Sequence, residues 1–315
     1  MTSGVAKSDR FVKNRDNPEI PPELGHFSLT SRGNVRQTSG TKETLMRTLR
    51  FCTSLAVALA AISIFTASAA TDTLGNGAIN VGSADYFTVL AKGDAGFTDD
   101  TITGPSFVTG NYGLGGQGTL SITGSSKITG KLVNHTGGQV NGSAAISGGV
   151  ITNDAQLSQA LADAQMLSDA AAAESPSAAF ASLTNVNITN PSQNITITGG
   201  PNEKVVLSLQ NFTISNGTFT LQGTSTTSFI INVAKNFSLN NGGISLAGVP
   251  PQNVLFNILG KGGQVSLNQG TQLPGILLAL NRKVDLSGGH VTGKVIANQV
   301  VITSGGSAVT PTTNR

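Results

Sequence analysis

The strongest constraint on the fold is a short phrase that recurs through most of the chain. The phrase alternates apolar and small polar residues and then ends in Gly, Asn or Ser. Examples are LSITGS (120–125), AAISGG (144–149), ITITGG (195–200), FTISNGTFTLQG (212–223), FSLNNGGISLAG (237–248), VSLNQG (265–270), VDLSGG (284–289) and VVITSGG (300–306). Alternation with a period of two predicts half-buried strands, and Gly and Asn suit corners that need a positive φ. The chain is therefore predicted to be mostly β.

The spacing of these strands separates two all-β architectures. A small-residue corner follows almost every strand, and strict Asn-Gly hairpins are few. These features favour a β-solenoid, in which each coil stacks on its neighbour and buries one side chain of every alternating pair. With coils of about 20 residues, the chain supplies on the order of ten of them. A hairpin sandwich is the alternative.

One segment breaks the strand pattern and is predicted to be a long α-helix over about residues 154–174. Asn153 can cap it with Gln156 three residues later, and Pro176 ends it. Apolar residues recur at helical spacing at positions 157, 160, 161, 164, 167 and 171. We expect the resulting Ala- and Leu-rich stripe to lie on one face of the solenoid.

Residues 1–70 are interpreted as a leader followed by a targeting segment. Residues 1–45 are basic, contain prolines and lack apolar periodicity, so they are interpreted as a disordered leader, with translation expected to begin at Met46. Residues 46–70 have the basic head, the apolar stretch Phe51–Phe65 and the small-residue end of a signal peptide. An uncleaved membrane anchor with a cytosolic tail is the alternative. Residues 72–310 are predicted to be a single β-solenoid domain, and 311–315 a frayed tail.

This division predicts a secreted protein, or one at the cell surface without an evident C-terminal anchor. The signal peptide gives it transient contact with the membrane. Residues 1–69 hold nine Lys or Arg and five Asp or Glu, whereas residues 70–315 hold ten and eleven. The nearly neutral mature part gives no electrostatic reason to expect nucleic acid as a partner. Cys52 lies inside the predicted signal peptide, so we expect no disulfide in the mature chain.

Residues that carry chemistry are few, and their spacing does not favour an active site. His135 and His290 have no acidic neighbour in the sequence and make a poor metal site. The acidic residues Asp94, Asp99 and Asp100 are interpreted as solvated loop residues, and Asp85 lies upstream of them. We therefore predict a non-enzymatic protein with no catalytic, cofactor-binding or metal-ligating residue. A carbohydrate-active β-helix enzyme is retained as a rival, because such an enzyme needs acids and bases that converge in a groove.

A phrase repeated across the chain tests this interpretation. KITGKLVNH (127–135) and HVTGKVIAN (290–298) align with Lys131 on Lys294 and Gly130 on Gly293. They are not phosphate-binding loops, because the preceding Gly and the following helix are missing. We predict that both phrases are strands at the same coil position and that both lysines face solvent.

Two sets of polar residues suggest surface roles. Alternate Thr hydroxyls in 195–198 and 212–220 could order water or meet carbohydrate, although Thr is also simply a good solvent-facing strand residue. Asn-x-Ser/Thr triplets, which accept glycans in some hosts, begin at Asn134, Asn141, Asn187, Asn194, Asn211, Asn216 and Asn236.

The C-terminal third resembles a known secreted family. The matching stretches are Asn253–Ile258, Val265–Leu267, Pro274–Ala279, Val284–Gly289 and Val291–Ala297. They resemble the bacterial choice-of-anchor A domain, an adhesive, collagen-binding-like family, with Phe256 and Leu280 where that family has Trp and Pro. The resemblance covers most of residues 80–306 and implies a coil shape, not a reaction. The sequence to Arg315 shows none of the variable anchors that give this family its name, so we expect release, or attachment through partners, instead of direct attachment to the cell surface.

A second resemblance is to the microbial ice-binding β-solenoids, which also pair a solenoid with a long helix. Asp85–Ala91, Phe229–Val233 and Gly275–Ala279 are similar to their opening, middle and closing strands. The first resemblance implies an adhesive protein whose partner is extracellular matrix, a surface polysaccharide or another cell-surface component, and this is the function we expect. Ice binding is the alternative, with a flat ladder of outward Thr as its expected sign.

Overall fold

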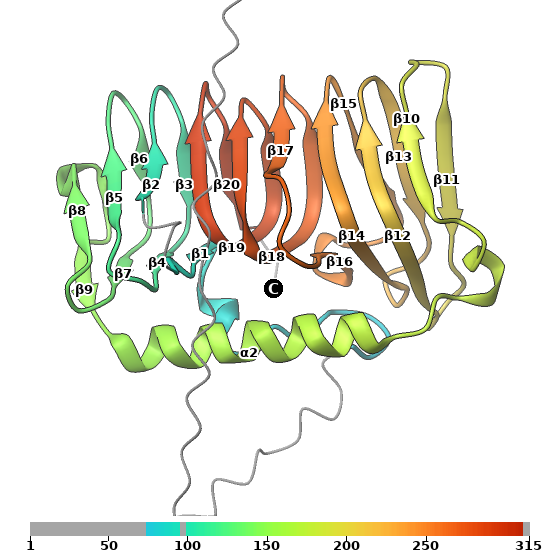
Figure 1. Ribbon diagram of the computed structural model, residues 1–315, viewed down its shortest axis with the longest axis horizontal. Coiled ribbons are helices and arrows are strands. Elements are labelled where there is room, and N and C mark those ends of the chain that lie inside the picture. The colour runs from blue at the N-terminus through green and yellow to red at the C-terminus, as the bar shows by residue number, and fades with distance from the viewer. Residues whose placement is uncertain (1–73, 95–98, 311–315) are drawn as a thin grey trace, which may run out of the picture. The chain divides into compact units, whose positions relative to one another are not determined.

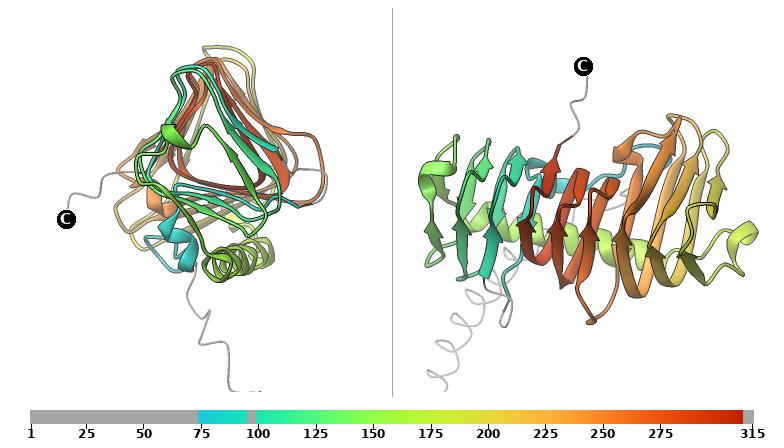
Figure 2. Two further views of the ribbon diagram at one scale, coloured as in Figure 1. Left: turned by 90° about the vertical axis from the view of Figure 1, so that its left-hand side faces the viewer. Right: turned by 90° about the horizontal axis from the view of Figure 1, so that it is seen from above.

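A computed structural model describes residues 74–94 and 99–310 of the chain. In this part the strands wind into a solenoid of triangular cross-section with a long helix along one side (Figures 1 and 2). The predicted fold class is therefore confirmed. The predicted leader and signal peptide, residues 1–70, lie outside the described residues, and the domain limits stay predictions. Within the described residues, no helix is long and apolar enough to cross a membrane.

The first block of coils precedes the helix. It opens with a 3-10 helix, η1 (Gly82–Tyr86), and closes with a second, η2 (Ser143–Ala145), before its last strand. Its strands are β1 (Val89–Ala91), β2 (Asp99–Ile102), β3 (Phe107–Thr109), β4 (Tyr112–Leu114), β5 (Thr119–Ile122), β6 (Lys127–Ile128), β7 (Leu132–Asn134), β8 (Gln139–Asn141) and β9 (Val150–Thr152). From β1 to β8 every third strand is stacked in parallel, so β1, β4 and β7 share one side of the triangle, and β9 then stacks on β7.

The helix α2 (Asp154–Ala173) confirms the sequence prediction over its whole length. The Asn153 side chain accepts a hydrogen bond from the Gln156 backbone N–H at 3.1 Å and caps its first turn. The buried stripe consists of Leu157, Ala160, Ala164, Leu167 and Ala171. The helix carries the chain from one end of the stack to the other (Figure 1).

The second block of coils returns from the far end to the middle of the stack. It contains η3 (Ala178–Phe180) and η4 (Pro251–Asn253). Its strands are β10 (Asn185–Ile188), β11 (Asn194–Thr198), β12 (Lys204–Ile214), β13 (Gly217–Gln222), β14 (Ser228–Asn240), β15 (Gly242–Ala247), β16 (Val254–Ile258), β17 (Val265–Asn268), β18 (Gln272–Ser287), β19 (His290–Thr303) and β20 (Ser307–Val309). β19 then pairs with β1 and β2, and β20 with β3, so the last coil meets the first.

The long strands bend around the corners and contribute to more than one side of the triangle. The helix-covered face contains β1, β4, β7, β9, β16 and parts of β12, β14, β18 and β19. The continuous face contains β10, β17, β2, β5, β8 and the second halves of β12, β14, β18 and β19. The interrupted face contains β11, β13, β15, β20, β3, β6 and the starts of β18 and β19.

The core fills the inside of the triangle with stacked apolar side chains. On the continuous face, for example, Val186, Phe212 and Phe237 form one inward row through the pairing of β10, β12 and β14. The rings of Phe212 and Phe237 stack at 5.1 Å between centroids, and Phe256 meets both edge-on. Burial of such in-register rows is the main stabilising term of the stack.

The repeated phrase occupies one coil position twice, as predicted, but one lysine is not where we expected it. Val295 pairs with Val89, which pairs with Tyr112, and Tyr112 with Leu132, so the residues that precede them, Lys294 and Lys131, lie at equivalent corners. Lys131 is exposed. The expectation for Lys294 is wrong, because it is only 8% exposed. The N-terminal η1 segment covers Lys294, whose Nζ donates to the carbonyls of Asp85 and Phe87. The strand pattern in the sequence did not indicate that this segment crosses the corner.

Candidate functional site

The helix-covered face is not available to a large ligand. The apolar stripe of α2 packs on outward side chains of this face, including Leu90, Val133, Ile230 and Leu255. Buried amides fix the helix in place: Asn232 Nδ2 donates to the carbonyl of Ala171 at 2.6 Å, and Asn257 Nδ2 to that of Ser168 at 3.0 Å. Side chains that point outward here are therefore part of a second core.

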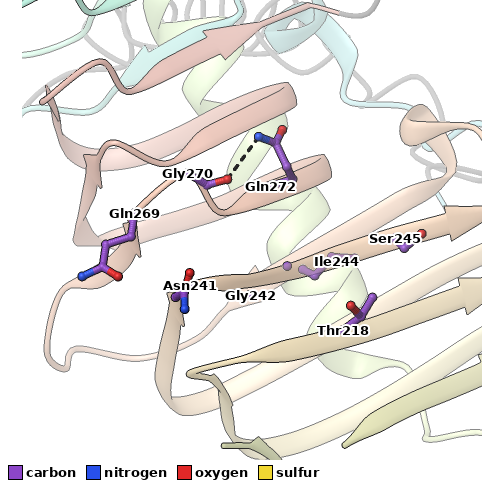
Figure 3. Close-up of a pocket in the computed structure, with 9 residues that line it drawn as sticks. Thr218, Asn241, Gly242, Ile244, Ser245, Gln269, Gly270 and Gln272 are labelled. Atoms are coloured by element: carbon purple, nitrogen blue, oxygen red, sulfur yellow. Dashed lines mark hydrogen bonds between the residues drawn. The ribbon is translucent and has the colours of Figure 1, made fainter. Parts of the chain in front are cut away.

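The interrupted face has a break between β15 and β18. Strands β11, β13 and β15 form a sheet of their own, separate from the sheet that contains β18. A cavity of about 460 Å³ lies at the break and is lined by uncharged residues. These are Thr218, Asn241, Gly242, Gly243, Ile244, Ser245, Gln269, Gly270 and Gln272 (Figure 3). The hollow makes this face unsuitable for contact with a flat, extended surface.

The continuous face is paired without a gap along the whole stack. Its strands follow in the order β10, β12, β14, β17, β18, β19, β2, β5 and β8, all parallel. We call the outward residues at the middle of each strand the central row. They are Asn187, Thr213, Ser238, Ser266, Asp285, Val301, Thr101, Ser121 and Asn141. Strict register places neighbours in this row about 4.8 Å apart.

Side-chain hydrogen bonds hold part of this surface in a fixed conformation. Beside the central row, Asn211 Nδ2 donates to Asn185 Oδ1 and Asn236 Nδ2 to Asn211 Oδ1, each at 2.8 Å. Such Asn ladders lock the amides of successive strands into one orientation. The charged exceptions on the face include Asp99, Lys283 and Asp285, and the last two form an ion pair at 3.4 Å. The arrangement is a flat lattice of short hydroxyls and amides.

The four acidic residues singled out in the sequence do not share a cleft. Asp85 forms an ion pair with Lys294 at 3.1 Å, and Asp94 forms one with Lys92 at 2.6 Å. Asp99 is exposed on the continuous face, while Asp100 is 2% exposed and points into the core. The interpretation of Asp100 as a solvated loop residue is therefore wrong. Its strand pairs between β19 and β5, which places its side chain in the inward row beside Val300 and Leu120.

Burial gives Asp100 unusual acid–base behaviour. Its carboxyl accepts hydrogen bonds from the Tyr112 hydroxyl at 2.9 Å and from the Val300 backbone N–H at 2.7 Å. Desolvation, partly opposed by these hydrogen bonds, raises the pKa of Asp100 to about 7. The group is enclosed among core side chains, so it has no route to a substrate.

The two histidines lie on different parts of the surface. His290 Nδ1 is 2.8 Å from Ser307 Oγ on the interrupted face, and His135 follows β7 on the helix-covered face. Among the described residues, no group of three or more His, Cys, Asp and Glu side chains comes together.

The Thr-rich stretches are divided between two faces. Thr213 lies on the continuous face, but Thr196 and Thr220 pair with each other on the interrupted face, because the chain turns a corner between β12 and β13. These threonines therefore do not form a single ladder. The central row was missed in the sequence because most of its members alternate among Ser, Thr and Asn. Its signal was the polar position inside phrases such as FTISN, FSLNN and LSITG.

Comparison with known proteins identifies the family. The model of the family described as "Putative Ice-binding-like adhesive domain" matches residues 80–309. The chain belongs to this family. No curated protein matches the chain. Membership of the choice-of-anchor A family, our first resemblance, is not shown by the comparisons and stays a prediction.

Several solved structures are similar to this member of the ice-binding-like family at low sequence identity. The ice-binding protein of the Antarctic ascomycete Antarctomyces psychrotrophicus is 20% identical, with 75% of this chain and 100% of that chain covered and a TM-score of 0.46. A glycosylated ice-binding protein from Arctic yeast is 17% identical over 78% and 97% of the two chains, with a TM-score of 0.47. A domain of a Shewanella frigidimarina ice-binding protein is 16% identical over 76% and 100%, also at 0.47.

These comparisons correct the function we expected first. The family is described as an ice-binding-like adhesive domain, so its description names the likeness to ice-binding proteins that we had ranked second. Adhesion as the primary function is therefore contradicted, and the comparisons favour the alternative.

Proposed function

We propose that the chain is a non-enzymatic ice-binding protein that contacts ice through its continuous face. The observation that carries the proposal is the unbroken central row. Ice presents a periodic array of water oxygens, and binding to it requires a flat surface whose polar groups repeat at a fixed interval. In-register parallel strands supply that repeat, and ordered water can bridge the hydroxyls and amides to the crystal. The predicted export is consistent with a role outside the cell.

The other two faces support this choice by contrast. The helix occupies one, and the groove between β15 and β18 breaks the other. The outward groups of the central row are short, so few rotamers are lost on binding. The row also includes Val301, whose apolar side chain adds no competing hydration.

Matched threonine variants test the proposal. Thr101→Tyr places a bulky ring in the central row, and Thr220→Tyr places the same ring on the interrupted face. We expect wild type and Thr220→Tyr to show thermal hysteresis and inhibition of ice recrystallisation, and Thr101→Tyr to lose most of both. Thermal unfolding by circular dichroism checks that the two variants are equally folded. An inactive wild type, or equal activity in both variants, would reject the proposal.

A further inference from the structure

The end of the stack formed by β8 and β9 is an unfinished coil. β8 pairs with β5 and β9 with β7, and among the described residues neither strand has a partner on its other side. An edge strand of this kind presents a row of free N–H and C=O groups that can pair with another strand. This end therefore has backbone hydrogen-bonding capacity that the described part of the fold does not use.

The same end leaves core side chains uncovered. Val140 and Val150 stack on the buried residues Leu120 and Leu132, in inward positions. Because no coil within residues 74–94 and 99–310 stacks on this side of them, Val150 is 41% exposed, and its neighbour Ile151 is 39% exposed. η2 covers only part of the end, through Ala145.

The opposite end is built differently. Its terminal strand β10 has its inward residues Val186 and Ile188 fully buried. Phe180 and Leu183, which follow α2, pack against the core. A second copy that arrived there with its β8–β9 end would find the core already covered. The uncovered end is therefore complementary to another uncovered end.

Charge also permits two such ends to meet. The segment from Gln139 to Thr152 contains no Asp, Glu, Lys, Arg or His. A two-fold axis brings each group of an interface opposite its own copy or a near neighbour, so charged residues there would face like charges. In this arrangement each edge strand lies antiparallel to a strand of the other copy, which satisfies the free backbone groups.

We propose that the β8–β9 end is an interface through which two copies of the chain associate end to end. The occupant is a second copy because its own β8–β9 end supplies matching strand edges, apolar side chains and no charge. Association would cover Val150 and Ile151 and extend the stack across the two-fold axis. The proposal does not depend on ice binding.

The test is the association state of the full chain and of two charge variants. Sedimentation equilibrium should find a concentration-dependent dimer in wild type. Ile151→Lys should shift the equilibrium to monomer, whereas Met166→Lys, which charges another exposed apolar residue (45%) on the outside of α2, should leave it unchanged. A monomeric wild type at all accessible concentrations, or a dimer that Ile151→Lys does not weaken, would overturn the proposal.

Hydrogen exchange identifies the surface without a mutation. Backbone amides of β8 and β9 should gain protection as wild-type concentration rises through the dimerisation range, while those of β10 and β11 should not change. If β9 amides are equally protected in dilute monomer, another part of the same chain covers the edge, and the proposed interface is wrong.

Discussion

The backbone N–H of Val300 donates a hydrogen bond of 2.7 Å to the carboxyl of Asp100, across the seam where the last coil meets the first. Asp100 occupies a core position that Val300 and Leu120 fill on the neighbouring strands. A titratable group is thus buried where the last coil pairs with the first. Its protonation should affect how firmly the two blocks of coils are joined.

Asp100→Asn should therefore reduce the dependence of stability on pH. Because burial raises the folded-state pKa from 3.8 to about 7, the folded protein binds the proton more tightly than the unfolded chain. The free energy of unfolding should fall as pH rises from about 4 to about 7, by up to about 4 kcal/mol from this group, and then level off. Asn can accept from Val300 and donate to the Tyr112 oxygen without titrating.

Urea unfolding at pH 5 and pH 8 measures the effect. Both proteins are compared by the free energy of unfolding that they lose between pH 5 and pH 8. This loss should be larger in wild type than in Asp100→Asn. Asp94→Asn, which makes the same change of charge at an exposed residue away from Asp100, should behave as wild type. A pH dependence that Asp100→Asn leaves intact would show that other groups cause it.

Lys294 and Lys131 offer a matched pair for the second prediction. Lys294 Nζ donates to the carbonyls of Asp85 at 2.6 Å and Phe87 at 3.1 Å, whereas Lys131 is exposed at the equivalent corner. Lys294→Met should cost about 1–3 kcal/mol of unfolding free energy, because buried carbonyls lose their donor. Lys131→Met should change it by less than about 0.5 kcal/mol. Chemical denaturation compares the two, and equal effects would contradict the anchoring role of Lys294.

Much of the coil geometry could be predicted from the sequence, because it depends on local patterns. The alternation in phrases such as FSLNN fixes which side chains face inward, and Asn153 and Pro176 mark the limits of the helix. The coil position shared by the two repeated phrases followed from the same pattern. These signals lie within a few residues of each other, so they can be recognised in a single sequence.

The stacking order and the burial of single polar residues could not be predicted in this way. Coils of similar sequence can stack in several orders, and nothing local indicates that β19 pairs with β1. Asp100 was misplaced because the residue beside it in space is Val300, far along the chain. The candidate surface was missed for a related reason: the central row repeats across strands, and its members in any one strand look like ordinary solvent-facing residues.

Arg282 is the basis of a third prediction. Its side chain is 1% exposed at the corner of β18 and donates to five backbone carbonyls, those of Ala234, Lys235, Leu259, Gly260 and Gly263. The guanidinium has five N–H donors in a fixed plane, which an ammonium cannot replace. Arg282→Lys should therefore lower the free energy of unfolding by roughly 3 kcal/mol. Lys283→Ala, next in the chain, should change it by less than about 0.5 kcal/mol. Full stability of Arg282→Lys in urea would rule out this role.

Asp285 carries the one charge in the central row, which gives a prediction for ice binding itself. Its neighbours in the row are Ser266 and Val301, and its side chain is 18% exposed beside Lys283. A carboxylate holds its hydration water more tightly than a hydroxyl does, and this competes with an ice-like arrangement. Asp285→Ser should therefore increase thermal hysteresis at equal protein concentration. Asp94→Ser removes the same charge from another lysine pair away from the row and should leave hysteresis unchanged. Lower hysteresis in Asp285→Ser, at unchanged thermal stability, would instead mean that the carboxylate takes part in contact with ice.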